Sequence, residues 1–311
     1  GGPYTIDDRP GPGAGDGQFM QPVGIATGPD GSIYVMDSGN ARVERFSPDG
    51  AFIGAWGPRN GVDLLRTDTG FGPTGIATGP DGNVYLADTW NHRIFVVDPS
   101  GAVILQIGGP TADTSDDPAN VKKFPGQFFG PRAIAAGKDA IYVADTGNER
   151  IQVFSPDGTF ENAFGGYGHD DGQLVEPVGL AIGPDGDIYV ADSGNQRISI
   201  FSPDGTFLRS FLVESWPVPD PSGLRPFFQP YLTFDQAGNL IVSSSASGSI
   251  EIYDPKTGEP VDSIRAAAGE PLKEPIGVAI AGNGDLLVTD SGASTVVRVP
   301  ARQLPGAGPA G

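Results

Sequence analysis

Short hydrophobic runs recur along the chain at similar intervals, each bounded by turn-forming residues. Most residues in these runs are β-branched or aromatic, and Gly-Pro-Asp-Gly or a close variant precedes each run. Short runs of this kind between turns predict β-strands rather than helices. The six runs are residues 33–35, 84–86, 141–143, 188–190, 240–242 and 286–288.

These runs are nearly unbroken in apolar character, which is typical of strands covered on both faces. The runs that follow them alternate more, as in Val-Glu-Arg-Phe at 43–46 and Ile-Gln-Val-Phe at 151–154. Alternation is typical of a strand with one face in water. We therefore expect the second strand of each unit to be fully buried and the third to lie nearer solvent.

The strands belong to a repeat, best seen from Pro177 to Gly205. A Pro-led strand is followed by Gly-Pro-Asp-Gly, a second strand, Asp-Ser-Gly-Asn-x-Arg, a third strand and Ser-Pro-Asp-Gly. A chain that repeats the same order of strands and turns is typical of a repeat architecture. Copies begin near Pro22, Pro73, Pro131, Pro177, Pro230 and Pro275.

The series Asp-Ser/Thr-Gly-Asn-x-Arg-Ile/Val, as at residues 145–151, resembles the NHL repeat, and the resemblance covers roughly residues 18–300. It implies an all-β, six-bladed β-propeller of four-stranded antiparallel blades, but no single activity. Residues 1–304 are expected to form one domain, followed by a linker-like tail at 305–311. The sixth copy lacks a fourth strand, so we expect Tyr4, Thr5 and Ile6 to complete it and close the ring.

Composition narrows the functions. The 48 Gly and 30 Pro fit short strands and tight turns, and the absence of Cys excludes disulfides and thiolate metal sites. A formal charge of −19 opposes binding to nucleic-acid phosphates and to anionic lipid. No apolar run reaches membrane-span length and no signal peptide is evident. Together with Gly/Pro-rich ends, this favours a domain of a longer or secreted protein, outside the cytoplasm.

Three long insertions, at residues 58–70, 110–126 and 213–228, are predicted to emerge on the same propeller face as the Asp-Ser-Gly-Asn turns. Insertions gathered on one face of a repeat array are typical of a working surface. The alternative is that they are tolerated surface excursions.

The repeated aspartates have two interpretations. A ring of carboxylates could hold Ca²⁺, whereas an Asp that begins a turn accepts backbone N–H groups. Because a feature present in most blades is expected to build blades, we favour the structural role and predict no metal site. The aspartates are Asp37, Asp88, Asp145, Asp192 and Asp290.

Departures from the repeat are better candidates for ligand contacts. In the second copy Trp90 replaces the turn Gly, with His92 nearby; an exposed Trp stacks on a ligand or on a neighbouring loop. At the start of the innermost strand, Arg132 stands where other copies have Val, Thr or Ile, and Tyr231 stands at or beside a position that is Gly in other copies. They are expected to face the central channel, where they either hold an anionic or carbonyl ligand or bond to each other or to backbone. Trp216 is expected to pack its insertion down or to line a groove.

Catalysis has less support. The peptide-amidating lyases resemble this chain and use three zinc-bound His with an Arg and a Tyr, which Arg132 and Tyr231 could mimic. Only His92 and His169 exist here, too few for such a site. Both remain candidates for ligand contacts. The same shortage counts against virginiamycin-type lyases. We therefore predict no catalytic residue and expect a domain that binds a protein, peptide or glycan. A divalent-cation-dependent, lactonase-like hydrolase or lyase remains the alternative.

Overall fold

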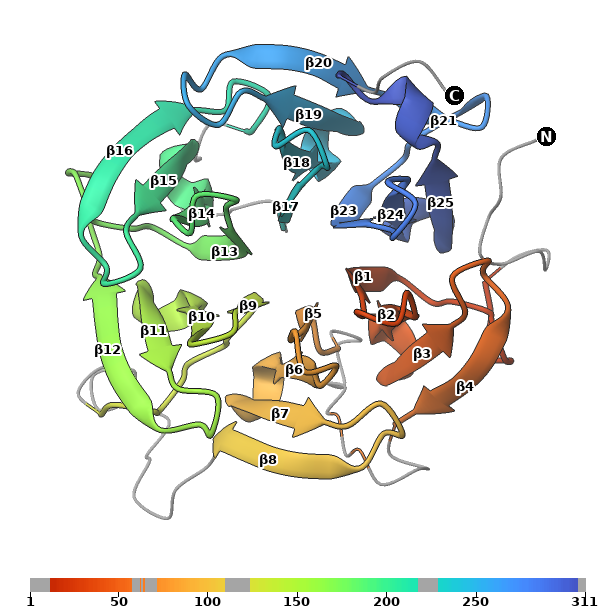
Figure 1. Cartoon of the computed structure of the whole chain (residues 1–311), viewed down its shortest axis with the longest axis horizontal. Helices are drawn as coiled ribbons and strands as arrows, with labels where there is room; N and C mark the ends of the chain where they lie inside the picture. Colours follow the sequence, from red (N-terminus) through yellow and green to blue (C-terminus); the bar gives the residue numbers. More distant parts are fainter. Residues whose placement is uncertain are drawn as a thin grey trace.

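The computed structural model describes residues 12–57, 62, 64, 72–109, 124–217 and 229–306. Its sheets stand radially around a central axis, one strand of each nearest the axis and one at the rim (Figure 1). Five sheets have four antiparallel strands in sequence order, and the sixth has three strands among these residues. The expected six-bladed β-propeller is confirmed. The helices among the described residues are single 3₁₀ turns, too short to cross a membrane.

The strand bounds follow the repeat. The innermost strands are β1 (Pro22–Thr27), β5 (Ile76–Thr78), β9 (Ile134–Ala136), β13 (Pro177–Ile182), β17 (Leu232–Phe234) and β23 (Pro275–Ile280). The second strands are β2 (Ile33–Asp37), β6 (Val84–Asp88), β10 (Ile141–Asp145), β14 (Ile188–Asp192), β18 (Leu240–Ser244) and β24 (Leu286–Asp290). The third strands are β3 (Arg42–Phe46), β7 (Arg93–Val97), β11 (Arg150–Phe154), β15 (Arg197–Phe201), β19 (Ser249–Tyr253) and β25 (Thr295–Val299).

The outer strands are β4 (Phe52–Trp56), β8 (Val103–Gly108), β12 (Phe160–Gly165), β16 (Phe207–Leu212) and β20 (Pro260–Ile264). A small hairpin, β21 (Ala266–Ala267) with β22 (Glu270–Pro271), follows β20. The turns between second and third strands, called here the repeat turns, contain the 3₁₀ turns η1 (Ser38–Asn40), η3 (Thr89–Asn91), η4 (Thr146–Asn148), η5 (Ser193–Asn195), η6 (Ser245–Ser247) and η7 (Ser291–Ala293); η8 (Ala301–Gln303) follows β25.

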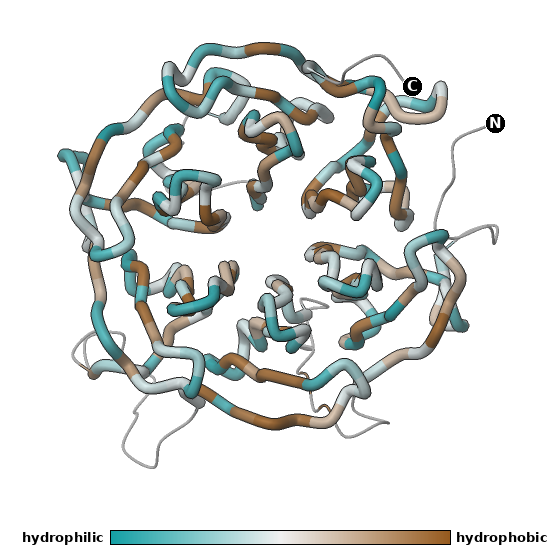
Figure 2. The backbone as a smooth tube through the Cα atoms, in the orientation of Figure 1, coloured by the Kyte–Doolittle hydropathy of each residue, from teal (hydrophilic) through white to brown (hydrophobic). Residues whose placement is uncertain are grey.

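The core is divided among the seams between consecutive blades. Figure 2 shows hydrophobic colour within the strands and mostly hydrophilic or neutral colour in the turns. Every residue of all six second strands is buried, as the sequence predicts. Trp56 is buried against the second blade, in the cluster that contains Tyr34 and Phe95. Covering both faces of each sheet explains why the first three residues of every second strand are apolar or aromatic, with polar residues confined to the last two positions.

The third strands lie nearer solvent than the second strands, as expected, but only in part: Arg45 and Arg298 are partly exposed, whereas every residue of the second strands is buried. The alternating polar residues do not all face water. Glu44 and Gln152, the polar residues behind that expectation, have no exposed surface. Glu44 Oε1 and the Gln152 amide group bond to the segments that lead into their blades, and Gln152 also bonds to Asp145. In a propeller, alternation therefore marks buried polar contacts as well as an exposed face.

The ring closes by packing between the last blade and the first. Ile25 and Val35 of blade 1 share a buried cluster with Ala279 and Leu287 of blade 6. Across the same seam, Thr289 Oγ1 donates to the Val23 carbonyl oxygen at 2.6 Å. The predicted contribution of Tyr4, Thr5 and Ile6 to blade 6 lies outside the described residues.

Glycines at the start of the innermost strands allow neighbouring blades to approach closely. A Cβ added at Gly75 would lie 1.9 Å from the Arg132 carbonyl oxygen, whereas one at Gly282 meets nothing within 4 Å. We expect Gly75→Ala to destabilise the protein by about 1–3 kcal/mol, because backbone must move to make room. Gly282→Ala is the matched control and should stay within about 0.5 kcal/mol. Equal denaturant midpoints for the two variants would contradict this close contact.

Candidate functional site

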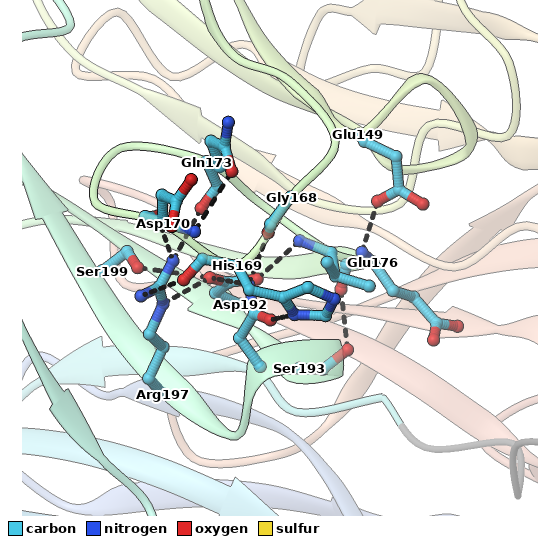
Figure 3. Close-up of polar contacts among 12 residues, drawn as sticks. Glu149, Gly168, His169, Asp170, Gln173, Glu176, Asp192, Ser193, Arg197 and Ser199 are labelled. Atoms are coloured by element: carbon cyan, nitrogen blue, oxygen red, sulfur yellow. Dashed lines mark hydrogen bonds and ion pairs between the residues drawn. The ribbon is translucent and has the colours of Figure 1, made fainter. Parts of the chain in front are cut away.

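The repeat aspartates tie each turn to the chain that leads into its blade. Asp192 Oδ1 accepts the Val175 N–H at 2.7 Å. Its Oδ2 accepts Asn195 Nδ2 at 2.8 Å and Arg197 Nε at 2.7 Å (Figure 3). Asp37 and Asp145 make the same set of bonds in blades 1 and 3. These carboxylates have the structural role that the turn chemistry predicts.

The repeat arginine extends the same network. Arg197 donates to the carbonyl oxygens of His169, Asp170 and Gln173, in the segment between blades 3 and 4. Burial raises the pKa of Asp192, opposed by its hydrogen bonds to Val175, Asn195 and Arg197. Within the described ranges, no three His, Asp or Glu side chains are grouped as a metal ion would require.

In each repeat turn the left-handed residue is the one that follows the 3₁₀ turn, which in blades 1 to 4 is the residue after Asn. It is His92, with φ 55°, in blade 2 and Glu149, with φ 57°, in blade 3. Asn instead turns its amide toward the Asp carboxylate, as Asn148 does toward Asp145 at 2.8 Å. The position that must adopt positive φ is therefore the most variable one in the motif.

Side chains at this left-handed position reach the next blade, and we call these contacts inter-blade latches. His92 Nδ1 accepts the Gly130 N–H at 2.9 Å, and its ring stacks on Phe129 at 5.0 Å. Glu149 accepts the Glu176 N–H, and Gln196 Nε2 donates to the Trp216 carbonyl oxygen at 2.6 Å. Sequence reasoning missed these latches, because the position carries a different residue in each blade. His92 thus has a structural contact across a seam.

The two tryptophans singled out in the sequence are both engaged by protein. Trp90 is half-buried, and its indole N–H donates to the Gly72 carbonyl oxygen at 3.0 Å. It is thus less exposed than expected and contacts the neighbouring loop. Trp216 is 2 % exposed, in the core between blades 4 and 5, and donates to the Ser243 carbonyl oxygen at 3.2 Å. Of the two roles considered for Trp216, the structure shows the packing role.

Arg132 and Tyr231 are in contact at the channel, where the Tyr231 side chain meets the Arg132 main chain. The Tyr231 hydroxyl donates to the Arg132 carbonyl oxygen at 3.4 Å. Burial raises the pKa of Tyr231 to about 12, and a hydrogen bond with Thr74 opposes that rise. Thr74 belongs to blade 2, opposite blade 5, so the Tyr231 side chain reaches across the axis. This contact is of the kind expected in the alternative in which the two residues bond to each other or to backbone.

The Arg132 guanidinium points to an acidic neighbour. Its side chain is 15 % exposed and lies 3.9 Å from a carboxylate oxygen of Glu176. Burial lowers the pKa of Arg132, and the Glu176 carboxylate opposes that change. Beside Tyr231, a cavity of about 350 Å³ continues along the axis, lined by all six innermost strands. Its wall is mostly aliphatic, with Thr27 and Thr78 already bonded to carbonyl oxygens of neighbouring blades.

The last predicted candidate, His169, lies in a solvent-facing groove of about 460 Å³. Its Nδ1 is 2.6 Å from Asn195 Oδ1. Asn195 Nδ2 donates to Asp192 and to the Gly168 carbonyl oxygen, which fixes Oδ1 toward the imidazole. In a neutral imidazole Nδ1 then carries the hydrogen and Nε2 is the acceptor. The groove is lined by His169, Gly194, Asn195, Gln196, Arg197, Ser210, Phe211 and Leu212.

Two large exposed side chains flank this arrangement. Tyr167 is 67 % exposed with its ring 6.2 Å from that of His169, and Leu212 is 67 % exposed on β16. The groove thus combines an oriented imidazole with accessible aromatic and aliphatic surface. We call it the His169 groove.

Comparisons with known proteins agree with the architecture. The NHL repeat family matches residues 19–46, 72–97 and 174–201. The chain therefore contains NHL repeats, and the matched segments form blades 1, 2 and 4 of its six-bladed β-propeller. Among curated relatives, it is 26 % identical over 180 residues to a probable peptidyl-alpha-hydroxyglycine alpha-amidating lyase of Caenorhabditis elegans, covering 56 % of this chain and 45 % of the lyase. It is 31 % identical over 155 residues to human NHL repeat-containing protein 2, covering 43 % of this chain and 21 % of that protein. The chain thus spans less than half of either relative.

Solved structures share the shape at low identity. A gluconolactonase from Xanthomonas campestris superposes with a TM-score of 0.64 at 18 % identity, covering 95 % of this chain and 88 % of that one. A virginiamycin B lyase from Staphylococcus aureus gives a TM-score of 0.56 at 16 % identity, covering 88 % of this chain and 78 % of that one. At these identities the similarity establishes the fold alone.

Proposed function

We propose that this propeller is a non-catalytic binding domain that presents the face of its repeat turns to a protein, peptide or glycan. We place it outside the cytoplasm, within a larger envelope or secreted protein, on the basis of its acidic, Cys-free composition. We expect no required cofactor; Ca²⁺ is the ion to test. The net charge of −19 argues against nucleic-acid partners.

The His169 groove carries this proposal. The repeat side chains Asp192 and Arg197 form hydrogen bonds with the segment that leads into their blade, and Trp216 is buried. In contrast, His169 directs an acceptor nitrogen outward beside exposed Tyr167 and Leu212. Aromatic surface next to a few fixed polar groups is the usual chemistry of a recognition site.

The test is a selection for ligands followed by mutation of the groove. The domain would be screened against a phage-displayed random peptide library and a glycan array. For any ligand recovered, we expect His169→Ala and Tyr167→Ala to weaken binding by about tenfold or more, measured by calorimetry. Val261→Ala is the matched control, because Val261 is an exposed apolar residue (45 %) on β20, away from the groove. Equal affinity for all three variants would contradict the assigned site.

A divalent-cation-dependent hydrolase or lyase is the second candidate, favoured by the axial cavity and by the shape shared with the gluconolactonase. Ca²⁺ and Zn²⁺ would be added separately while the thermal midpoint is followed, since selective binding to the folded state must raise it. The binding-domain proposal expects little change with either ion. A rise of several degrees that one carboxylate substitution abolishes would support the enzyme instead.

A further inference from the structure

The second residue after the repeat arginine lies beneath the repeat aspartate. In blade 3 this residue is Gln152, whose Nε2 donates to Asp145 Oδ2 at 3.0 Å. In blade 4 it is Ser199, whose hydroxyl lies 3.4 Å from Asp192 Oδ2. Two blades thus use a neutral hydrogen-bond donor at this position, which suits a buried carboxylate that needs its lone pairs satisfied.

Blade 1 has Glu44 at the same position. Its side chain is 0 % exposed, and Oε1 lies 2.8 Å from an Arg42 guanidinium nitrogen and accepts the Gly17 N–H at 3.2 Å. Gln152 Oε1 accepts the corresponding Gly126 N–H at 2.9 Å, so the two side chains are oriented alike. Glu44 Oε2 therefore occupies the place of the donating Gln152 Nε2.

This second oxygen is buried and has no hydrogen-bond partner among the described residues. As a carboxylate oxygen it would face Asp37, which like itself can only accept. As a protonated oxygen it would supply the donor that Gln152 supplies in blade 3. Two carboxyl groups in one buried site commonly share a proton in this way.

We propose that Glu44 keeps a proton on Oε2 at neutral pH and donates a hydrogen bond through it to Asp37. Alkaline pH then breaks this contact, which together with Arg42 we call the Glu44 lock. Loss of the proton to solvent leaves two carboxylates facing each other, with the single Arg42 guanidinium between them. The charged groups that face Glu44 are Arg42 from β3, Asp37 from β2 and Asp16 from the segment leading into β1.

The electrostatic environment agrees with this geometry. Burial raises the pKa of Glu44 to about 8, Arg42 opposes the rise, and Asp37 adds to it. The pKa in the folded protein is thus above the ordinary value of 4.5. Its contribution to stability is complete below pH 4.5 and is lost as the pH rises through 8. Within that window, this proton makes the unfolding equilibrium constant rise by up to about tenfold per pH unit.

Through Arg42, the Glu44 lock holds the segment before β1, which lies at the seam between blades 6 and 1. Arg42 binds the carbonyl oxygens of Ala14, Gly15 and Gln18 in the segment before β1. Gln21, the next residue but two, donates its N–H to Ser294 of blade 6 at 3.5 Å. Ionisation of Glu44 should therefore loosen the segment at the seam that closes the ring.

The test exchanges the two blades' residues. We expect Glu44→Gln, which installs the blade 3 residue, to remove the one-proton slope of unfolding between pH 5 and 8, measured in denaturant. The reciprocal Gln152→Glu should add a similar slope through Asp145. A direct ¹³C NMR titration of the Glu44 carboxyl group should give a midpoint near 8, and hydrogen exchange at Gly17 should accelerate above that pH.

A Glu44 midpoint below pH 6 would overturn the proposal. Parallel stability profiles for the wild-type protein and Glu44→Gln would do the same. If Glu44→Gln fails to fold, the carboxyl titration of the unmodified protein and the profile of Gln152→Glu still decide the matter.

Discussion

Asp145→Ala is expected to destabilise the protein by about 3–5 kcal/mol, because removing one partner of a buried ion pair leaves the other uncompensated. Asp145 is completely buried and accepts bonds from the Phe129 N–H, Asn148, Arg150 and Gln152. All four donors lose this acceptor in the variant, although Arg150 and Gln152 keep their bonds to the Gln127 carbonyl oxygen. Denaturant unfolding followed by intrinsic fluorescence measures the loss.

Asp157→Ala is the matched control in the same blade. Asp157 lies in an exposed turn between the third and outer strands, where it accepts the Thr159 N–H at 3.0 Å. We expect it to cost less than about 1 kcal/mol, since water replaces the lost bond. Similar losses for the two variants would show that the repeat aspartates contribute no more than ordinary turn residues.

Trp216→Ala should have an effect of the same size, about 3–5 kcal/mol, from the cavity it creates. Trp216 fills the seam between blades 4 and 5, packed with residues that include Ile198, Leu232 and Tyr253. The truncation also removes the indole donor from the Ser243 carbonyl oxygen. Chemical denaturation and hydrogen exchange in β18 would measure the weakened seam.

Leu212→Ala serves as the control for Trp216, because it removes an apolar side chain nearby that is 67 % exposed. We expect a change within about 0.5 kcal/mol. A small effect of Trp216→Ala, comparable to that of Leu212→Ala, would mean that the seam collapses around the missing ring.

The blades were predictable because the apolar runs and turn residues within each repeat are enough to locate its strands and turns. The unbroken apolar runs gave the buried second strands, and the turn chemistry gave the role of Asp145 and Asp192. Tyr231 lines the axial cavity, where its repeat position predicts it, whereas the Arg132 side chain lies beside Glu176. The predictions that succeeded were those in which local pattern and overall fold require the same residue.

What the sequence could not give depends on contacts between distant segments. Glu44 looked solvent-facing because alternation does not distinguish water from a buried turn as the partner of a polar group. The latch role of His92 depends on the next blade's backbone, and the groove position of His169 depends on the orientation of Asn195. Residues 58–61, 63, 65–70, 110–123 and 218–228, from the predicted insertions, lie outside the described part of the chain.

The inter-blade latches have a consequence for how such a ring can change. His92, Glu149 and Gln196 each bond to a main-chain group of the next blade. A main-chain partner is present whatever side chain stands there, so neighbouring blades need not mutate in concert. Each junction can thus diversify independently, and a transplanted blade should fit wherever its strand spacing is kept.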